Sequence, residues 1–399
     1  MKRAMTKIIN IVDANRDYYC SKKFSFIKFD LERKTTYTCH AAAPHPVDFD
    51  WLEKNPGQIF NNPINIHERQ QMLANERNSS CEQNCWPAED KGAVSPRLYQ
   101  GGNIKTHTDV ITTPTTIDIT IGSDCNLQCL YCCKEFSSTW RNDIIKNGNY
   151  DLDSEANRYK KETMDVALSS VSQRNRHNKH YQLLIDELIL NSKNLEEALI
   201  TGGEPLLNNS LLDIISELSH VPVIQIYSGL GLSYSRFFRI VTQLAQYKNV
   251  QLIISAEGIG KFLEFNRFGI RWEDFQKKMQ VLSSLNIKTV FQSTLTNLSL
   301  FGFAEFYEYF KHYQITPTFA YQPNMMAPCV LDNESKQYII DSIKLLPEEV
   351  KNNIIKSMSA EPSEEQRIDI GKFLKEFKKR NNQLDLSIYP NSFLTWVEI

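Results

Sequence analysis

The middle of the chain alternates short apolar runs with amphipathic stretches. The apolar runs cover residues 115–122, 197–203, 221–229, 250–258, 287–297 and 315–323. Between some of them, residues 234–247 and 271–285 carry apolar side chains at helical spacing. Strands that alternate with helices predict successive βα units and a parallel sheet, which closes fully or partly into a barrel. We therefore expect an α/β domain over residues 114–330.

The segments on either side of this domain lack the alternation of strands and helices. Residues 1–113 are broken up by prolines, and within them residues 23–39 predict a hairpin and residues 66–77 a helix. Residues 331–399 predict two or three amphipathic helices, among them 335–346 and 370–380, followed by a possible strand at 384–390. The expected organisation is thus a small N-terminal module, a central domain and a C-terminal helical extension.

The interval between the first two predicted strands is too long for one helix. Residues 146–165 inside it are polar and rich in asparagine. We interpret this segment as an inserted surface loop or helix, and its position makes it a candidate for substrate recognition, as are the C-terminal helices.

Composition excludes some classes of partner and location. The 399 residues include 41% hydrophobic and 23% charged residues, with a formal net charge of −2, so no field of one sign favours a polyanion partner. The N-terminus lacks the apolar core of a secretion signal, and no run of apolar residues is long enough to cross a membrane. We expect a cytoplasmic protein without a membrane partner. In that reducing compartment, clustered thiols are more often metal ligands or redox groups than disulfides.

Four of the nine cysteines fall in the stretch DCNLQCLYCC, positions 124–133. Cys125, Cys129 and Cys132 have the spacing C-x3-C-x2-C directly after the first predicted strand of the central domain. Three thiolates suit zinc or an iron-sulfur cluster. A closed structural zinc site needs four ligands, whereas a [4Fe-4S] cluster held by three cysteines leaves one iron open. A zinc loop with a fourth ligand from elsewhere, or simply buried thiols, stays open at this point. Cys133 is a poor fourth ligand, because adjacent residues rarely both turn toward one small site.

Two motifs together resemble a known family. CNLQCLYC, positions 125–132, is similar to the C-x3-C-x-aromatic-C signature of the radical S-adenosylmethionine (SAM) enzymes, and LITGGEPLLN, positions 199–208, to their Gly-Gly-Glu-Pro motif. The resemblance covers the central zone and implies a partial (βα)6 barrel. It also implies that Cys125, Cys129 and Cys132 hold a [4Fe-4S] cluster, whose fourth iron binds the methionyl amine and carboxylate of SAM.

The same resemblance assigns further residues to the cofactor. It implies that the amino group of SAM is held by Gly202, Gly203, Glu204 and Pro205, and that Tyr131 lies near the adenine. Ser228 ends the third predicted strand, and Ser255 and Glu257 end the fourth, where the family places contacts to ribose and carboxylate.

Four more cysteines lie in the N-terminal segment. Cys20 and Cys39 flank the predicted hairpin, and Cys81 and Cys85 follow the predicted helix. Four thiols in a region with little core of its own predict a metal site that staples the module. The segment resembles the SPASM or Twitch modules of radical SAM enzymes, which carry an auxiliary iron-sulfur cluster. Those modules usually follow the barrel, and here the second pair has C-x3-C spacing, so a structural zinc remains an alternative. His40 and His45 are possible ligands, although histidines near loops are more often hydrogen-bonded or solvated.

Cys133 and Cys329 remain without an assigned role. A buried cysteine is most often just a small hydrophobic residue. A sharper hypothesis is that Cys329, just past the last predicted strand, donates a hydrogen atom to a product radical.

The expected function is reductive cleavage of SAM to a 5′-deoxyadenosyl radical, which abstracts hydrogen from a substrate. A peptide or protein side chain is the first expectation, because auxiliary modules are frequent in peptide-modifying members. A nucleotide, a modified DNA base or a small metabolite is the alternative, and a non-catalytic iron-sulfur or zinc protein is a third. Such an enzyme requires a small electron donor such as flavodoxin or ferredoxin.

Overall fold

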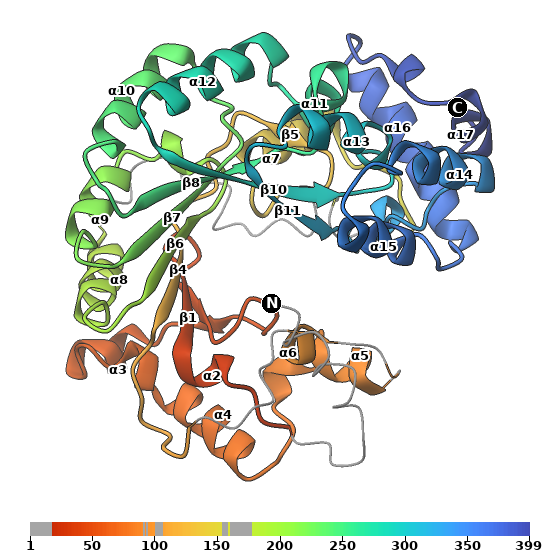
Figure 1. The fold of residues 1–399 in the computed structure, drawn as a ribbon. Coiled ribbons are helices and arrows are strands. Elements are labelled where there is room, and N and C mark those ends of the chain that lie inside the picture. Colours follow the sequence, from red (N-terminus) through yellow and green to blue (C-terminus); the bar gives the residue numbers. More distant parts are fainter. Residues whose placement is uncertain (1–17, 91, 93–94, 100–106, 154–158, 160–177) are drawn as a thin grey trace. The chain divides into compact units, whose positions relative to one another are not determined.

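The computed structural model describes residues 18–90, 92, 95–99, 107–153, 159 and 178–399. The chain divides into two compact units, whose elements are labelled in Figure 1. Unit 1 consists of Met1–Ile121, Val171–Ile200 and Leu212–Ile224, and unit 2 of Gly122–Ser170, Thr201–Leu211 and Gln225–Ile399. The chain therefore passes several times between the units. The boundaries expected after residues 113 and 330 stay a prediction.

The strands of unit 1 include the predicted hairpin. Their order is β6 (Glu197–Thr201, apart from its last residue), β4 (Thr116–Thr120), β1 (Phe26–Asp30), β2 (Thr35–Tyr37) and β3 (His45–Pro46). β1 pairs antiparallel with β2, which confirms the hairpin, and parallel with β4. The parallel pairing explains why Phe26, Ile27 and Phe29 are all buried, since β1 has neighbours on both sides and covered faces.

Short helices surround these strands. They are α2 (Lys22–Ser25), α3 (Phe49–Lys54), η1 (Ile59–Asn61), α4 (Pro63–Leu73), η2 (Ser79–Cys81), α5 (Cys85–Asp90), α6 (Pro96–Tyr99), α8 (Lys179–Leu190) and, apart from its first residue, α9 (Leu211–Glu217). α4 begins three residues before the predicted helix, because Pro63 occupies its first turn and the Asn62 side chain caps Asn65. It ends before Arg77, since Asn75 adopts a left-handed backbone with φ of 61°.

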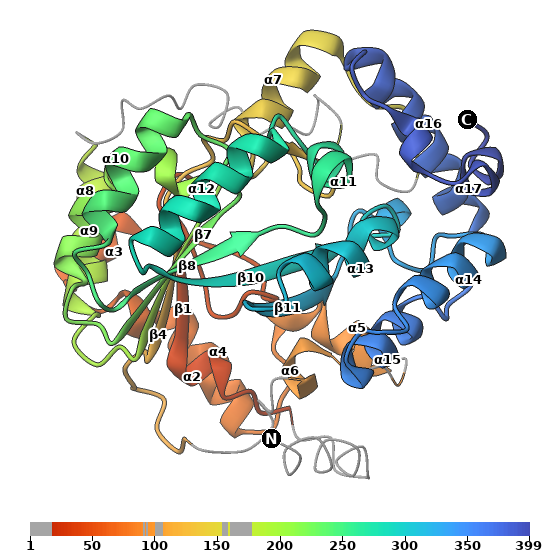
Figure 2. The same cartoon turned by 45° about the horizontal axis from the view of Figure 1, so that its top comes forward.

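Unit 2 contains the later strands of the predicted βα series. Their order is β11 (Gln314–Phe319), β10 (Lys288–Leu295), β8 (Val250–Ser255) and, apart from its first two residues, β7 (Val223–Ser228). β10 pairs parallel with both β8 and β11. The connecting helices are α10 (Tyr234–Leu244), α12 (Trp272–Ser284) and α13 (Leu300–Tyr309), and α10 and α12 lie side by side (Figure 2). The α/β class with a parallel sheet is confirmed, and the partial (βα)6 barrel stays a prediction.

The regular elements in the C-terminal part of unit 2 are all helices. The elements are η6 (Asn324–Met326), α14 (Asn333–Ser342), α15 (Glu348–Ser357), α16 (Glu364–Arg380), η7 (Leu386–Ile388) and α17 (Asn391–Trp396). The possible strand at 384–390 is wrong. The Asp385 side chain accepts a hydrogen bond from the Ser387 backbone N–H, which favours a 3-10 turn over an extended chain.

The insertion after the cysteine loop is partly described. Residues 154–158 and 160–165 lie outside the described part of the chain. The described residues Tyr150 and Tyr159 are fully buried, whereas Asn149, Asp151 and Asp153 are exposed, so the inserted surface loop or helix stays a prediction. Their rings pack with Trp140 of α7 (Ser138–Asn147) and with Phe373 of α16. An aromatic core thus supports the segment that follows the cysteine loop.

Candidate functional site

The cysteine loop of unit 2 is fixed by backbone hydrogen bonds. A two-stranded sheet pairs β5 (Gln128–Cys129) with β9 (Arg267–Phe268), with Cys129 opposite Arg267. The Leu130 N–H donates to the Asn266 carbonyl at 3.0 Å, and the indole N–H of Trp140 donates to the Cys129 carbonyl at 2.9 Å. The thiols are therefore presented by a loop whose backbone is held from several sides.

The three thiols of this loop are free and partly buried. Burial is the main reason that the pKa of Cys125 rises to about 12 and that of Cys129 to about 11. Burial also raises the pKa of Cys132 well above its usual value, and Cys133, Cys129 and Cys125 add to the rise. The three predicted ligands belong to one loop, but among the residues that the structure describes no three His, Cys, Asp or Glu side chains, these thiols included, are placed around a single metal ion. Because a metal ion binds the thiolate form, metal binding here would release protons.

The Gly-Gly-Glu-Pro segment lies directly against the start of the cysteine loop. The Gly203 N–H donates to the Gly122 carbonyl at 2.9 Å, and the Glu204 N–H donates to the Asp124 carbonyl at 2.7 Å. A Cβ at Gly203 would come within 2.5 Å of the Asp124 oxygen, and a Cβ at Gly202 would collide with the Gly122 oxygen. Both glycines are needed because the two backbones approach too closely for any side chain.

Glu204 is buried, and its carboxylate accepts hydrogen bonds from three groups of the protein. Oε1 accepts from the Ser228 hydroxyl at 2.8 Å and from the Leu206 N–H at 3.2 Å, and Oε2 accepts from the Gly229 N–H at 3.1 Å. Burial raises the pKa of Glu204, and these hydrogen bonds oppose the rise. Glu204 therefore connects the segment after β6 to the end of β7, and Pro205 begins the short helix η5 (Pro205–Leu207).

Arg267 lies at the centre of the charged groups beside the cysteine loop. Its Nη2 forms an ion pair with Glu257 Oε2 at 2.7 Å and donates to the Tyr131 hydroxyl, and its Nη1 lies 3.6 Å from the Cys129 sulfur. Arg267 and Glu257 are only 3% and 0% exposed. The sequence analysis missed Arg267, because no motif contains it and only the β5–β9 pairing brings it to the loop.

Two buried polar atoms next to this loop have no protein partner in the described part of the chain. They are Oε1 of Glu257 and Nε2 of Gln128. Buried polar groups are normally hydrogen-bonded, so an orphaned acceptor and an orphaned donor are what a polar ligand would leave in its absence. Together with three soft thiol donors on one loop, the residues present fit an iron-sulfur cluster with a polar cofactor beside it.

Ser255 and Cys329 are less distinctive. Ser255 ends β8, partly buried, opposite Gln292 of β10. Cys329 follows η6 and is partly exposed, and burial raises its pKa. Cys133 is buried, in keeping with its interpretation as a small hydrophobic residue.

The structure also brings together the four cysteines of unit 1. Cys20, Cys39, Cys81 and Cys85 line one cavity of about 10 Å³, together with Lys23 and other residues. The pKa of Cys85 is lowered, mainly by its interaction with the neighbouring Cys81 thiol. Burial raises the pKa of Cys20 to about 11. Over the described residues, no three His, Cys, Asp or Glu side chains are placed around a single metal ion.

The histidines next to these cysteines contact carboxylates. His40 Nδ1 lies 3.2 Å from Asp118, and His45 Nε2 lies 2.9 Å from Glu68. These contacts agree with the interpretation of both histidines as hydrogen-bonded side chains rather than as metal ligands. No helix in the described part of the chain is long and apolar enough to cross a membrane.

Comparisons with known proteins give distant similarities only. No family model matches the chain, and no curated protein does. Among solved structures, the chain is similar to anSMEcpe with bound AdoMet, at 12% identity and a TM-score of 0.36, over 60% of this chain and 62% of that one. It is also similar to Streptococcus suis SuiB bound to S-adenosylmethionine, at 13% identity and a TM-score of 0.34, over 82% of this chain and 69% of that one. The match thus spans less than two thirds of anSMEcpe, and likeness at these scores supports no conclusion about activity or substrate.

Replacing Gly202 with Ala is expected to destabilise the protein strongly. Gly202 has φ of 136°, and its new Cβ would also collide with the Gly122 oxygen. Left-handed backbone costs about 1–2 kcal/mol and overpacking about 1–3 kcal/mol, so the free energy of unfolding should fall by about 2–5 kcal/mol. Urea titration measures the loss. Gly260→Ala is the matched control, since Gly260 has φ of 50° but no atom within 4 Å of the added Cβ. Equal losses in the two variants would contradict the close approach.

Replacing Arg267 with Met is expected to cost about 3–5 kcal/mol at neutral pH, because it leaves the Glu257 carboxylate buried and unpaired. Burial raises the pKa of Glu257, and Arg267 now opposes that rise. A carboxyl with a raised folded-state pKa loses its stabilising contribution as pH rises through that pKa. The loss in R267M should therefore be larger at about pH 8 than at about pH 5 in urea unfolding.

The double variant R267M/E257Q is the control for that experiment. It lacks the titrating carboxyl, so the extra loss at high pH should disappear. If the unfolding free energy of R267M falls by the same amount at both pH values, Glu257 is not the source of a pH-dependent loss.

Proposed function

We propose that this protein is a radical SAM enzyme, in which Cys125, Cys129 and Cys132 hold a [4Fe-4S] cluster and the neighbouring Gly-Gly-Glu-Pro segment binds SAM. The observation that carries the proposal is the backbone pairing of the Gly-Gly-Glu-Pro motif with the residues immediately before the cysteine motif. They are far apart in the sequence, yet Gly203 and Glu204 donate to the carbonyls of Gly122 and Asp124. A chance pair of motifs has no reason to meet in this way.

The chemistry of the donors supports the same conclusion. Three thiols on one loop leave a cluster iron without a protein ligand, which is the position that an amino acid ligand can occupy. A cluster held there would supply the single electron that reductive cleavage of SAM requires. The orphaned oxygen of buried Glu257 and the orphaned amide nitrogen of Gln128 are available to a polar group of the cofactor.

This chain's own residues have distinct tasks in the proposed site. The Arg267 guanidinium fixes the Cys129 sulfur and the Tyr131 hydroxyl relative to each other, which leaves the Tyr131 ring available beside the cofactor. Ser228 acts through Glu204, because its hydroxyl donates to that carboxylate. Glu204, the proposed partner of the SAM amine, is therefore already held in one position by the protein before SAM binds. Ser255 and Glu257 stay proposed contacts to ribose and carboxylate, and Cys329 stays a proposed hydrogen donor.

For the N-terminal cysteines we propose an auxiliary iron-sulfur cluster held by Cys20, Cys39, Cys81 and Cys85. Their thiols line one cavity, and three of them belong to one apolar cluster with Tyr19 and Trp86. Soft thiols in a dry setting favour a cluster or zinc over harder ions. The proposed substrate is a peptide or protein side chain, and the proposed electron donor is a small protein such as flavodoxin or ferredoxin.

The test is a comparison of SAM cleavage with iron content. Wild-type protein, reconstituted without oxygen and reduced with dithionite, should contain about eight irons per chain and form 5′-deoxyadenosine from SAM. The variant C125A/C129A/C132A should form none and retain about four irons, bound in the N-terminal segment.

Cys133→Ala is the matched control, since Cys133 adjoins Cys132 but is not a proposed ligand. It should keep both the cleavage and the iron. Continued 5′-deoxyadenosine formation by the triple variant would show that the catalytic cluster is assigned to the wrong cysteines.

A further inference from the structure

A buried lysine lies among the four cysteines of unit 1. Lys23 is 1% exposed and lines the same cavity as the four thiols. All three donors of its ammonium group are used, by Thr38 Oγ1 at 2.5 Å, Ser80 Oγ at 2.5 Å and Glu68 Oε2 at 2.6 Å. Placing a lysine in such a site costs free energy unless its charge and donors are fully compensated, which these contacts provide.

The partners of Lys23 adjoin the cysteines in the sequence. Thr38 precedes Cys39, and Ser80 precedes Cys81. The Lys23 backbone N–H donates to the Cys20 carbonyl at 3.1 Å. One residue thus joins three of the four cysteine-bearing segments, which come from separate parts of the chain. The segment of Cys20 is also joined to α6 by Arg97, whose Nη1 donates to the Tyr19 carbonyl at 2.8 Å.

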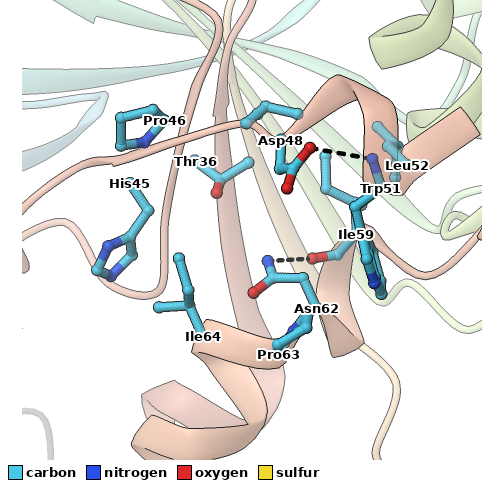
Figure 3. A pocket seen from close by; sticks show the side chains of 11 residues that line it. Thr36, His45, Pro46, Asp48, Trp51, Leu52, Ile59, Asn62, Pro63 and Ile64 are labelled. Carbon is cyan, nitrogen blue, oxygen red and sulfur yellow. Dashed lines mark hydrogen bonds between the residues drawn. The ribbon is translucent and has the colours of Figure 1, made fainter.

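The counter-charge of Lys23 is held in place from another direction. Glu68 Oε2 also accepts from the Thr38 hydroxyl at 2.9 Å, while Oε1 contacts His45 Nε2 at 2.9 Å. The pKa of Glu68 falls to about 2, because the hydrogen bond from His45 and the charge of Lys23 outweigh the effect of burial. His45 lines a cavity of about 150 Å³ with Thr36, Trp51 and Ile64 (Figure 3). The ion pair is therefore anchored, because one oxygen of Glu68 is held by Lys23 and Thr38 and the other by His45.

We infer that Lys23 is a positioning residue of the auxiliary cluster: it holds three cysteine segments in register and sets the reduction potential of the cluster with its positive charge. The inference rests on the proposed function, because it requires iron at these four cysteines. A fixed buried cation stabilises the more negative, reduced state of a cluster, and Glu68 reduces this effect. When the cluster is reduced, it takes one electron from an external low-potential donor, and no bond forms or breaks.

The test uses the full-length chain carrying C125A, C129A and C132A, so that only the N-terminal iron is observed. Protein is reconstituted anaerobically, its iron is counted, and the midpoint potential is measured by dithionite titration followed by electron paramagnetic resonance. Lys23→Met should lower the midpoint potential by the equivalent of at least a tenfold change in the reduction equilibrium, about 59 mV for one electron. Glu68→Gln, which keeps the lysine and removes the counter-charge, should raise it.

The midpoint potential is expected to fall in Lys23→Met and to rise in Glu68→Gln. These opposite shifts distinguish an electrostatic role of Lys23 from a merely structural one. A loosened site would shift both variants in the same direction or lose iron in both. Lys54→Met is the matched control, because Lys54 is exposed at the end of α3 in the same unit, and its removal should leave the potential unchanged. Lys23→Arg keeps the charge and should stay close to the parent potential.

Each result decides the question. If Lys23→Met binds iron with an unchanged potential, the inference is wrong. If Lys23→Met binds no iron, the positioning role is supported. The electrostatic role then depends on Glu68→Gln: a raised midpoint potential supports it, and an unchanged one contradicts it. Zinc without iron in the parent variant overturns the inference. The proposed function is tested separately, by 5′-deoxyadenosine formation in the wild-type protein, so the two failures are distinguishable.

Discussion

The backbone pairing between the Gly-Gly-Glu-Pro segment and the start of the cysteine loop is the constraint on which the candidate site depends. Two hydrogen bonds join Gly203 and Glu204 to the carbonyls of Gly122 and Asp124. The approach is possible only because residues 202 and 203 have no Cβ. That alignment fixes where Glu204 enters the interior, and the Glu204 carboxylate then accepts hydrogen bonds from the Ser228 hydroxyl and the Gly229 N–H.

Much of this arrangement can be predicted from the sequence. The strands and connecting helices follow from apolar periodicity, and the ligand loop follows from cysteine spacing, because both depend on local patterns. The features that could not be predicted depend on contacts between distant segments or on a single side-chain cap. The parallel pairing of β1 with β4 leaves no trace in either segment, and the 3-10 turn at Leu386–Ile388 depends on one side-chain cap from Asp385.

Arg267 and Lys23 show the limit of sequence reasoning most clearly. Each is an ordinary basic residue in the sequence, outside any motif, and each is almost completely buried beside thiols. Arg267 is placed by pairing of two short strands, and Lys23 by contacts to residues that precede two different cysteines. Burial of a charge is a property of the tertiary fold, so a pattern of residue types along the chain carries no signal for it.

The two thiol groups share one electrostatic design, although they lie in different units. In each, a buried cation is close to the cysteines and is paired with a buried carboxylate, Arg267 with Glu257 and Lys23 with Glu68. A protein that needed only neutral, inert thiols would not need to bury an ion pair beside them, since an apolar replacement of similar volume is often as stable. Deprotonated thiolates that carry a metal cluster have a net negative charge, and a fixed cation then offsets the cost of burying it. The carboxylate limits the excess of positive charge and holds the cation in one orientation. Both ion pairs are thus placed where the proposed anionic metal-thiolate groups would need a fixed cation.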